Sequence, residues 1–380
     1  MDTRRMGGRL KGGHDGFYLV VEPFCPSCAL RIAMTQNKPA KLPSTRELAR
    51  KLGLKIVRPE KLTLARKRHG EGFSYVDAKG RAIKDKRILM RLKKLAVPPA
   101  YEDVMYAADP RAHLQAIGRD AAGRLQYRYH ADWEKVRETR KAHRLAQFVG
   151  ALPRIRRQIG KLLSEEELTK EFALAAVIEL VANTSIRAGG DTYVKERGTR
   201  GATTLLKSNV RLQEGRIVLR FKAKGGKDFQ REVDAPRLAD AVEALRRLPG
   251  RRLFQYKTEN GVYAVRAQDV NRFLQEIADV AITLKDFRTL CASAAVLEEL
   301  SQLEPAKSQT GRKKQVRDAI KNAAEELNNT PTVCRKSYVH DAVVEAFENG
   351  VLEDYADALK ATRSPKKREE ALAEVIAAAC

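Results

Sequence analysis

The sequence predicts an α+β protein in which strands come first and helices follow. Between Gly72 and His130, short β-type segments alternate with turn sequences. From Trp133 onward, apolar residues recur at helical spacing for most of the remaining chain. Strand and helix segments separated in this way are typical of α+β folds or of two distinct domains. The chain's 380 residues are enough for two domains of ordinary size.

The strongest compositional feature is an excess of positive charge. Lys and Arg number 73 against 48 Asp and Glu, which gives a formal net charge of +25. Such an excess repels itself unless a polyanion neutralises it, and nucleic acid is the commonest polyanion. A ribosome-associated or membrane-surface protein would carry similar charge. No apolar run approaches a membrane span and no signal-peptide core is present, so we expect a cytoplasmic protein without a membrane partner.

Residues 1–60 carry the fewest structural signals, and we expect an N-terminal extension of unclear order. Cys25 and Cys28 have the spacing of half a zinc site. No second Cys or His pair follows at the distance of a zinc finger, and His14 is the only nearby candidate, so we expect no metal site. The five cysteines, an odd number scattered along the chain, fit a reducing compartment.

Residues 61–131 are predicted to form a β-rich, DNA-binding domain. A strand over 73–76 runs into the turn sequence at 77–80, and the two prolines in 97–100 mark a rigid connection. The Asp120–Gly123 turn between two extended runs predicts a β-hairpin.

The second strand of this hairpin is rich in tyrosine. Its period of two places three side chains on each face: Leu125, Tyr127 and Tyr129 on one, Gln126, Arg128 and His130 on the other. The simpler interpretation is an ordinary sheet with aromatic packing. The alternative is a DNA-facing strand whose polar groups meet phosphates and base edges, and the net charge favours it.

Residues 132–152 are predicted to be a linker or helix, and 153–380 a mainly helical domain, because Pro153 and a basic run mark a boundary. Ser164–Glu167 matches a capping box and is expected to open a buried helix that continues to Ala182. Arg187 then emerges where that helix stops and glycines follow.

A second hairpin and two more helices are expected further along. Strands over 209–213 and 216–222 are followed by a Gly-Gly turn into 228–233, with Lys224 at the tip. That position suits an ordinary polar turn residue as well as a lysine that reaches into a groove. Thr283–Asp286 begins a helix that carries Arg288 in its first turns.

Near the C-terminus, a charged amphipathic helix over 312–327 leads into Asn329. Thr330 and Pro331 then have the residue types of a helix N-cap and first turn, which places Tyr338 two turns into a short basic helix. By itself, such a tyrosine is most simply an amphipathic core residue.

The polar residues at these structural breaks are Arg187, Lys224, Arg288, Asn329 and Tyr338. Together they suggest transfer of a phosphoryl group to the tyrosine. Arginine forks match the non-bridging oxygens of phosphate, and a lysine among other cations can protonate a leaving alkoxide. The sequence has no P-loop and no acidic or histidine cluster at metal-ligand spacing, so we expect chemistry without ATP, metal or another cofactor.

Over about residues 70–360 the sequence resembles the type IB DNA topoisomerases, in their small poxvirus-like and bacterial form. The resemblance rests on five motifs: residues 118–129, 186–193, 221–224, 285–288 and 329–338. It implies that Tyr338 forms a 3′-phosphotyrosyl bond, that Arg187 and Arg288 grip the scissile phosphate, and that Lys224 is the general acid. Asn329 occupies a position where poxvirus and eukaryotic enzymes carry histidine. Gln126, Tyr127, Tyr129 and Tyr193 match DNA-contacting positions. Leu290-Cys291 and residues 1–60 depart from the family pattern.

The same resemblance implies a monomer with two lobes, a small β-rich one and a larger helical one with a small hairpin sheet. These lobes would close as a C-shaped clamp on double-stranded DNA and relax supercoils in the cytoplasm, associated with the nucleoid. A tyrosine recombinase shares the Arg, Lys, Arg and Tyr roles. Recombinases usually carry histidine where this chain has Lys285, and their N-terminal domain is typically helical. A non-enzymatic DNA-binding protein would leave the ordered five-residue set to chance.

Overall fold

The computed structural model describes residues 43–360 and 365–378, and all of them lie in one compact unit that begins at Leu42. The expectations for Cys25, Cys28 and His14 therefore lie outside the described residues. A short helix, α2 (Thr45–Lys51), begins within the stretch that the sequence left unassigned, and Ser44 and Glu47 form its capping box. Among the described residues, no helix is both long and apolar enough to cross a membrane.

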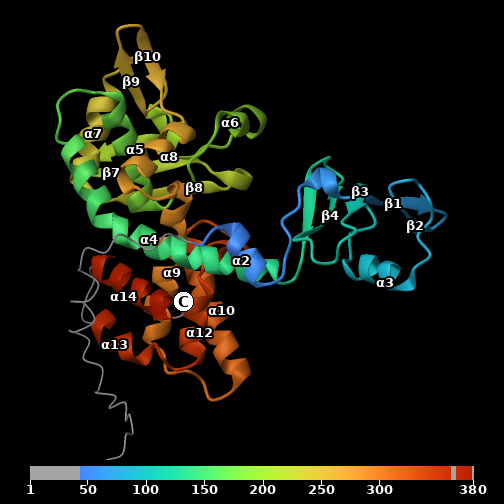
Figure 1. Ribbon diagram of the computed structural model, residues 1–380. Coiled ribbons are helices and arrows are strands. Elements are labelled where there is room, and N and C mark those ends of the chain that lie inside the picture. Colours follow the sequence, from blue (N-terminus) through green and yellow to red (C-terminus); the bar gives the residue numbers. More distant parts are fainter. Residues whose placement is uncertain (1–42, 361–364, 379–380) are drawn as a thin grey trace, which may run out of the picture. The chain divides into compact units, whose positions relative to one another are not determined.

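The first half of the described chain contains a five-stranded antiparallel sheet in the order β2-β1-β3-β4-β5 (Figure 1). Its core includes Tyr75, Val104 and Tyr106. The predicted strand and turn at 73–80 are confirmed. A helix between the strands, α3 (Lys86–Lys94), was not anticipated. The Asp85 carboxylate caps its N-terminus, and Leu92 packs in the core against the sheet. The bounds are β1 (Leu64–His69), β2 (Gly72–Val76), α3 (Lys86–Lys94), β3 (Glu102–Tyr106), β4 (Leu114–Arg119) and β5 (Leu125–Tyr129).

The hairpin of β4 and β5 is the predicted one. The Gly123 N–H donates to the Asp120 carbonyl at 2.8 Å, which closes the turn. Along β5, Tyr127 and Tyr129 lie on the same face with ring centroids 6.1 Å apart. Gln126 turns to the other side, where its amide donates to the Asp120 carboxylate at 2.9 Å.

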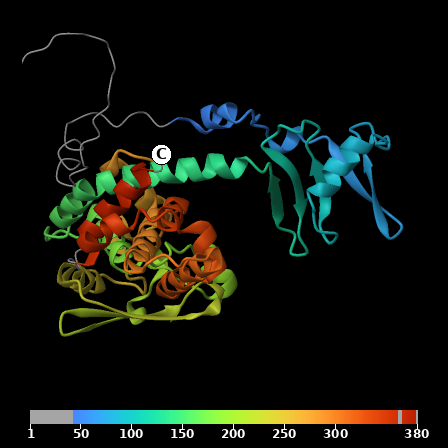
Figure 2. The same ribbon diagram turned by 90° about the horizontal axis from the view of Figure 1, so that it is seen from below.

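A single helix of 30 residues, α4 (Trp133–Leu162), continues through Pro153, where the sequence analysis placed a domain boundary (Figure 2). A proline inside a helix costs about 3 kcal/mol, because it removes one hydrogen bond and crowds the preceding turn. Here Leu152 and Ile155 beside it are buried in the main core, and their burial compensates for that cost. The first turn of α4 does not join the main core. It packs on α2 through Trp133 and Val136.

The buried helix α5 (Lys170–Thr184) begins five residues later than the capping-box sequence suggested. Thr169, not Ser164, is its N-cap, and the Thr169 hydroxyl accepts from the Phe172 N–H at 3.1 Å. The Ser164 hydroxyl instead donates to the Gly160 carbonyl at the end of α4, so the prediction for this residue was wrong. The helix stops at Ser185, whose φ of 53° is left-handed.

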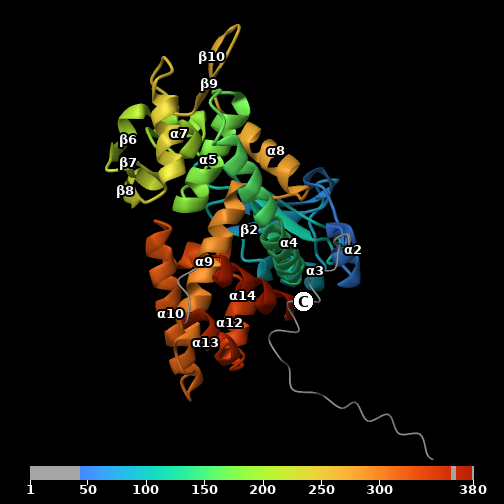
Figure 3. The same cartoon turned by 90° about the vertical axis from the view of Figure 1, so that its left-hand side faces the viewer.

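The rest of the chain is mainly helical, and the three-stranded antiparallel sheet β6-β7-β8 matches the predicted second hairpin. Helix α9 lies among the C-terminal helices and contacts α4, α10, α12, α13 and α14 (Figure 3). The bounds are α6 (Asp191–Arg197), β6 (Val210–Gln213), β7 (Arg216–Lys222), β8 (Asp228–Val233), α7 (Pro236–Arg246), β9 (Gln255–Thr258), β10 (Gly261–Ala264), α8 (Ala267–Ala278), α9 (Leu284–Ser301), α10 (Gln309–Glu326), α11 (Pro331–Ser337), α12 (Asp341–Glu348), α13 (Glu353–Lys360) and α14 (Pro365–Ala378). The chain is therefore a mixed helix and sheet protein, as expected.

Candidate active site

Tyr338 lies at the end of a short helix rather than within one. Thr330 caps α11 as predicted, and its hydroxyl accepts from the Val333 N–H at 3.3 Å. Tyr338 is the residue at which α11 ends, with φ of −132° and its N–H donating to the Cys334 carbonyl. The expected position two turns inside the helix is therefore corrected. Its side chain is 8% exposed.

Arg288 lies over the Tyr338 ring, with its guanidinium carbon 4.9 Å from the ring centroid. The arginine is 3% exposed and lies in the second turn of α9, where Thr283 and Asp286 form the predicted N-terminal cap. Main-chain carbonyls hold it: Arg288 donates to Ser185 O and, at 3.0 Å, to Leu327 O. Its Nε is buried and has no hydrogen-bond partner among the described residues.

Arg187 and Asn329 meet beside this pair. The Arg187 guanidinium donates to the Asn329 side-chain oxygen, which leaves the Asn329 Nδ2 buried without a partner among the described residues. Burial, and next the positive charge of Arg288, lower the pKa of Arg187. Two groups here, Asn329 Nδ2 and Arg288 Nε, are thus hydrogen-bond donors that the surrounding protein does not satisfy.

These cations change the chemistry of the Tyr338 phenol. Burial by itself raises its pKa, but Arg288, followed by Arg187 and Lys285, outweighs burial and leaves the pKa below its ordinary value. The Lys285 ammonium lies 5.7 Å from the ring centroid. The site therefore favours the phenolate form of Tyr338 more than water does.

Two residues that the sequence did not indicate hold the chain just after Tyr338. The Ser293 hydroxyl on α9 donates to Tyr338 O at 3.0 Å and accepts from the His340 N–H at 3.1 Å. Lys141 on α4 donates to Val339 O at 2.7 Å. Both resemble ordinary residues in the sequence, a serine in an apolar helix and a surface lysine, so no local signal could have found them.

Lys224 stands at the turn between β7 and β8, as predicted. Gly225 and Gly226 follow it with φ of 82° and 73°, a backbone shape that favours glycine. The lysine is exposed, and it lines a small hollow together with Arg187 and Arg288. The structure therefore brings all five predicted residues into one neighbourhood, in which Arg288 and Tyr338 are buried, Arg187 and Asn329 are half-buried and Lys224 is exposed.

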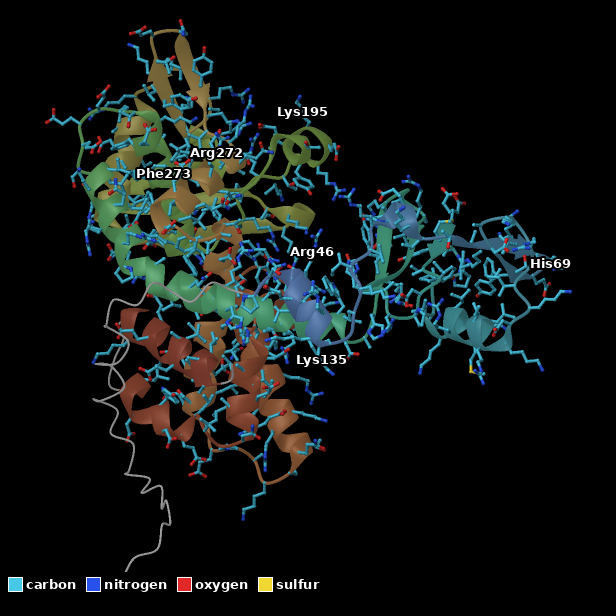
Figure 4. The ribbon with its side chains drawn as sticks, in the orientation of Figure 1. Arg46, His69, Lys135, Lys195, Arg272 and Phe273 are labelled. Atoms are coloured by element: carbon cyan, nitrogen blue, oxygen red, sulfur yellow. The ribbon has the colours of Figure 1, made fainter. Side chains whose placement is uncertain are left out.

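The predicted DNA-contacting residues lie elsewhere and are more exposed. Tyr127 and Tyr129 are 44% and 41% exposed, and Tyr129 also stacks on Trp133. Tyr193 on α6 is 56% exposed, with the Arg197 guanidinium 5.9 Å from its ring. Lys195 projects from the same helix (Figure 4).

A basic groove that the sequence analysis missed runs along α4. It encloses about 740 Å³, and its cationic lining residues are Arg137, Arg140, Lys141, Arg144, Lys285 and Lys336. The groove reaches Ser337, next to Tyr338. Within the described ranges, no three His, Cys, Asp or Glu side chains are grouped to hold a metal ion.

Comparison with known proteins identifies the family. The model of the eukaryotic DNA topoisomerase I catalytic core matches residues 128–365, more than half of the chain, and that of the bacterial DNA topoisomerase IB N-terminal domain matches residues 72–120. The chain belongs to the type IB DNA topoisomerase family. DNA topoisomerase 1B of Acanthamoeba polyphaga mimivirus is 30% identical over 293 residues, covering 75% of this chain and 87% of the relative. DNA topoisomerase 1B of Vaccinia virus (strain Copenhagen) is 24% identical over 243 residues, or 61% and 72% of the two chains.

Membership in this family makes the protein an isomerase that acts on DNA. It favours topoisomerase over recombinase, in agreement with Lys285 at the position where recombinases usually carry histidine. Leu290 and Cys291, which depart from the family pattern, lie on α9. Leu290 is buried in the core, and burial raises the pKa of the Cys291 thiol.

Proposed function

We propose that this topoisomerase relaxes supercoiled duplex DNA through a covalent bond between Tyr338 and the 3′-phosphate of one cleaved strand. The observation that carries the proposal is the Tyr338 phenol, buried against Arg288 and Arg187 with its pKa lowered by those cations. The strand would rotate while the enzyme holds the 3′ end, and the free 5′-hydroxyl would then attack the phosphotyrosine to reseal the DNA.

In the cleavage step, the Tyr338 oxygen attacks phosphorus while the bond from phosphorus to the 5′-oxygen breaks. The phenol proton leaves to solvent, and the neighbouring cations lower the cost of the phenolate. Lys224 gives a proton to the departing 5′-oxygen, so the leaving group departs as an alcohol rather than an alkoxide. Religation reverses this step: the 5′-hydroxyl attacks phosphorus and gives its proton to Lys224, while the bond to the Tyr338 oxygen breaks and the phenol regains a proton.

Arg187, Arg288 and Asn329 would bind the non-bridging oxygens of the scissile phosphate. Arginine suits this role because its planar fork donates two parallel hydrogen bonds and keeps its charge at any working pH. Among the described residues, no group accepts a hydrogen bond from the buried donors Arg288 Nε and Asn329 Nδ2. Donors fixed in place before the substrate arrives stabilise the charge of a phosphoryl transition state without reorganisation.

The wider duplex would be held by exposed side chains. Tyr127 and Tyr129 on β5 and Tyr193 on α6 are exposed and would contact phosphates and base edges. Gln126, on the other face of β5, is half-buried and would exchange its hydrogen bond with Asp120 for one with DNA. We place the DNA-binding domain at residues 61–131, the connection at 132–152 and the catalytic domain at 153–380, and propose that the two close as a clamp in a monomer. Separate family models match residues 72–120 and 128–365, which supports a boundary between the first domain and the remainder of the chain. An enzyme that acts on DNA in this way would work in the cytoplasm, associated with the nucleoid.

The proposal is tested with supercoiled plasmid in EDTA and without ATP. We expect a ladder of unlinked circles with successive linking numbers, and a covalent protein–DNA adduct at the 3′ end when the reaction is stopped with denaturant. The rate should be first order in enzyme. Recombinant or joined plasmids, or second-order dependence on enzyme, would instead support the recombinase alternative.

A further inference from the structure

Arg200 is a cation in the neighbourhood of the site that the mechanism above does not use. Its segment is docked on the segment that carries Arg187: Ala202 N–H donates to Arg187 O, and Thr203 N–H donates to Ala188 O, both at 2.8 Å. On the other side, Arg200 N–H donates to Lys222 O at 2.8 Å, two residues before Lys224. The Arg200 backbone is thus fixed between the Arg187 segment and the Lys224 hairpin.

The docking of these two segments requires a glycine after Arg200. A Cβ atom at Gly201 would lie under 3.0 Å from Arg187 O and from the Gly189 nitrogen, both of them backbone atoms. No flexible side chain could move aside to relieve that overlap. The close approach therefore holds Arg200 at a fixed place relative to Arg187.

The Arg200 guanidinium has unused hydrogen-bonding capacity. It donates through NH1 to Thr204 O at 2.9 Å, which leaves most of its five N–H donors free. Its neighbour Arg252 pairs with Asp191, whereas the described residues give Arg200 no carboxylate partner. Burial and the adjacent Arg252 and Arg251 lower the pKa of Arg200, as expected for a cation without an anion beside it.

The position of Arg200 relative to Tyr338 indicates which anion it would meet. Arg200 lines the small hollow with Arg187, Lys224 and Arg288, and Tyr338 does not. Arg187 and Arg288 also lower the pKa of Tyr338, so the hollow adjoins the same two arginines as the phenol. In an in-line displacement the leaving oxygen departs opposite the attacking one. Because Lys224, the proposed proton donor to the leaving 5′-oxygen, lines the hollow, we assign the hollow to the leaving-group side.

We propose that Arg200 binds the first DNA phosphate on the 3′ side of the scissile phosphate, in the strand that leaves with the 5′-hydroxyl. The inference rests on the proposed function, because that function defines the scissile phosphate and its leaving side. Arg200 thereby keeps the leaving end near Lys224 during cleavage and guides it back during religation.

The test replaces that one phosphate by an uncharged methylphosphonate in a cleavage substrate. With the wild-type enzyme, we expect the substitution to slow cleavage and religation about 10- to 100-fold, the usual range for loss of a charged hydrogen bond. Arg200→Ala should slow both steps on ordinary DNA by a similar factor. On methylphosphonate DNA, the variant should show almost no additional loss, since the partner of that phosphate is already gone.

Arg216→Ala is the matched control. It removes the same charge from the far end of β7, where Arg216 pairs with Glu232. This variant should retain the full sensitivity to the methylphosphonate. Arg200→Gln serves as a second variant, because its amide can still donate to Thr204 O while the charge is absent.

The inference is overturned if Arg200→Ala and Arg200→Gln remain as sensitive to the methylphosphonate as the wild type. Equal effects of Arg216→Ala and Arg200→Ala would also overturn it, because they would reflect net charge alone. A failure of the proposed function would look different: the wild-type enzyme itself would form no Tyr338-linked product on unmodified DNA.

Discussion

Two regions of this protein display tyrosines next to basic side chains, and their environments differ. On β5, Tyr127 and Tyr129 are about half exposed and stack on one another. At the end of α11, Tyr338 is almost fully buried against Arg288. Burial, and then Tyr127, raise the pKa of Tyr129, whereas the cations around Tyr338 overcome burial and lower its pKa.

The difference indicates that the surroundings, not the residue type, suit Tyr127 and Tyr129 to the proposed binding role and Tyr338 to the proposed attack. A phenol with a raised pKa stays neutral and is suited to stacking and to donating hydrogen bonds. A phenol with a lowered pKa among fixed arginines gives up its proton more readily and is suited to attack. The first of the following predictions tests this division directly, and the others test the groups that support the Tyr338 side of it.

The largest effect is expected for Tyr338→Phe. Without the hydroxyl, no covalent bond to DNA can form, so plasmid relaxation should be abolished while DNA binding persists. Tyr127→Phe and Tyr129→Phe, the matched changes on β5, should relax plasmid within about threefold of wild type, since each loses only a surface hydrogen bond. Relaxation by Tyr338→Phe at a tenth of the wild-type rate or more would show that the reactive tyrosine is elsewhere.

Lys224→Ala should slow cleavage by ~10²- to 10⁴-fold, the usual contribution of a general acid. A substrate with sulfur in place of the bridging 5′-oxygen has a leaving group that needs no proton, so it should recover most of the loss. Lys222→Ala is the control on the same hairpin, because Lys222 pairs with Asp228 at 2.8 Å and is assigned no proton transfer. If sulfur does not rescue Lys224→Ala, the lysine has another role.

The sequence was most informative at the residues that start or end helices and turns, namely the capping residues, glycines and prolines. Ser185 to Gly190 and Thr330-Pro331 mark the ends and starts of helices, and the site residues Arg187 and Tyr338 lie beside those marks. The Gly-Gly turn likewise placed Lys224. These features act through local backbone geometry, which neighbouring residues determine, and so they can be predicted without knowing the fold.

Several of the features that were missed depend on core packing or on distant parts of the chain, although the Ser44–Glu47 and Asp85 caps were local signals. Pro153 ends no helix because core packing of its neighbours outweighs a local preference, and Ser164 loses the N-cap to Thr169. Lys141 contacts Val339 across 198 residues of sequence. Local patterns do not encode such contacts, so the support behind Tyr338 was visible only in three dimensions.

A smaller effect is expected for Ser293→Ala, which leaves Tyr338 O and the His340 N–H without their shared partner. We expect the cleavage rate at saturating DNA to fall about 3- to 30-fold, with DNA affinity unchanged, because one positioning interaction is lost. Ser301→Ala on the same helix is the control, since that hydroxyl only bonds the Glu298 carbonyl. A Ser293→Ala enzyme that loses affinity but not rate would argue against a positioning role.

The smallest effect concerns acid stability of the catalytic region. Burial, followed by the positive charge of Lys141, lowers the pKa of His340 to about 4, below the ordinary 6.5 of an unfolded histidine. The unfolded chain therefore binds more protons between these values, so stability is lost as pH falls through that window. We expect a loss of about 2 kcal/mol between pH 7 and pH 5 from this residue, measured by urea unfolding.

His340→Asn should reduce that pH dependence by the same amount. Asparagine cannot titrate, yet its side-chain oxygen can replace Nδ1 as acceptor for the Ala342 N–H at the start of α12. An unchanged pH profile in this variant would place the acid sensitivity elsewhere in the fold.

The carbonyl groups that hold Arg288 have a consequence for how this site tolerates mutation. Ser185 and Leu327 contribute backbone oxygens, and Arg231 is held in the same way by Thr184 O and Glu326 O. Such contacts depend on where the helices α5 and α10 end, not on which side chains stand there. Substitutions that fit the surrounding core can therefore occur at these positions without releasing the arginines, provided that both helix ends keep their geometry.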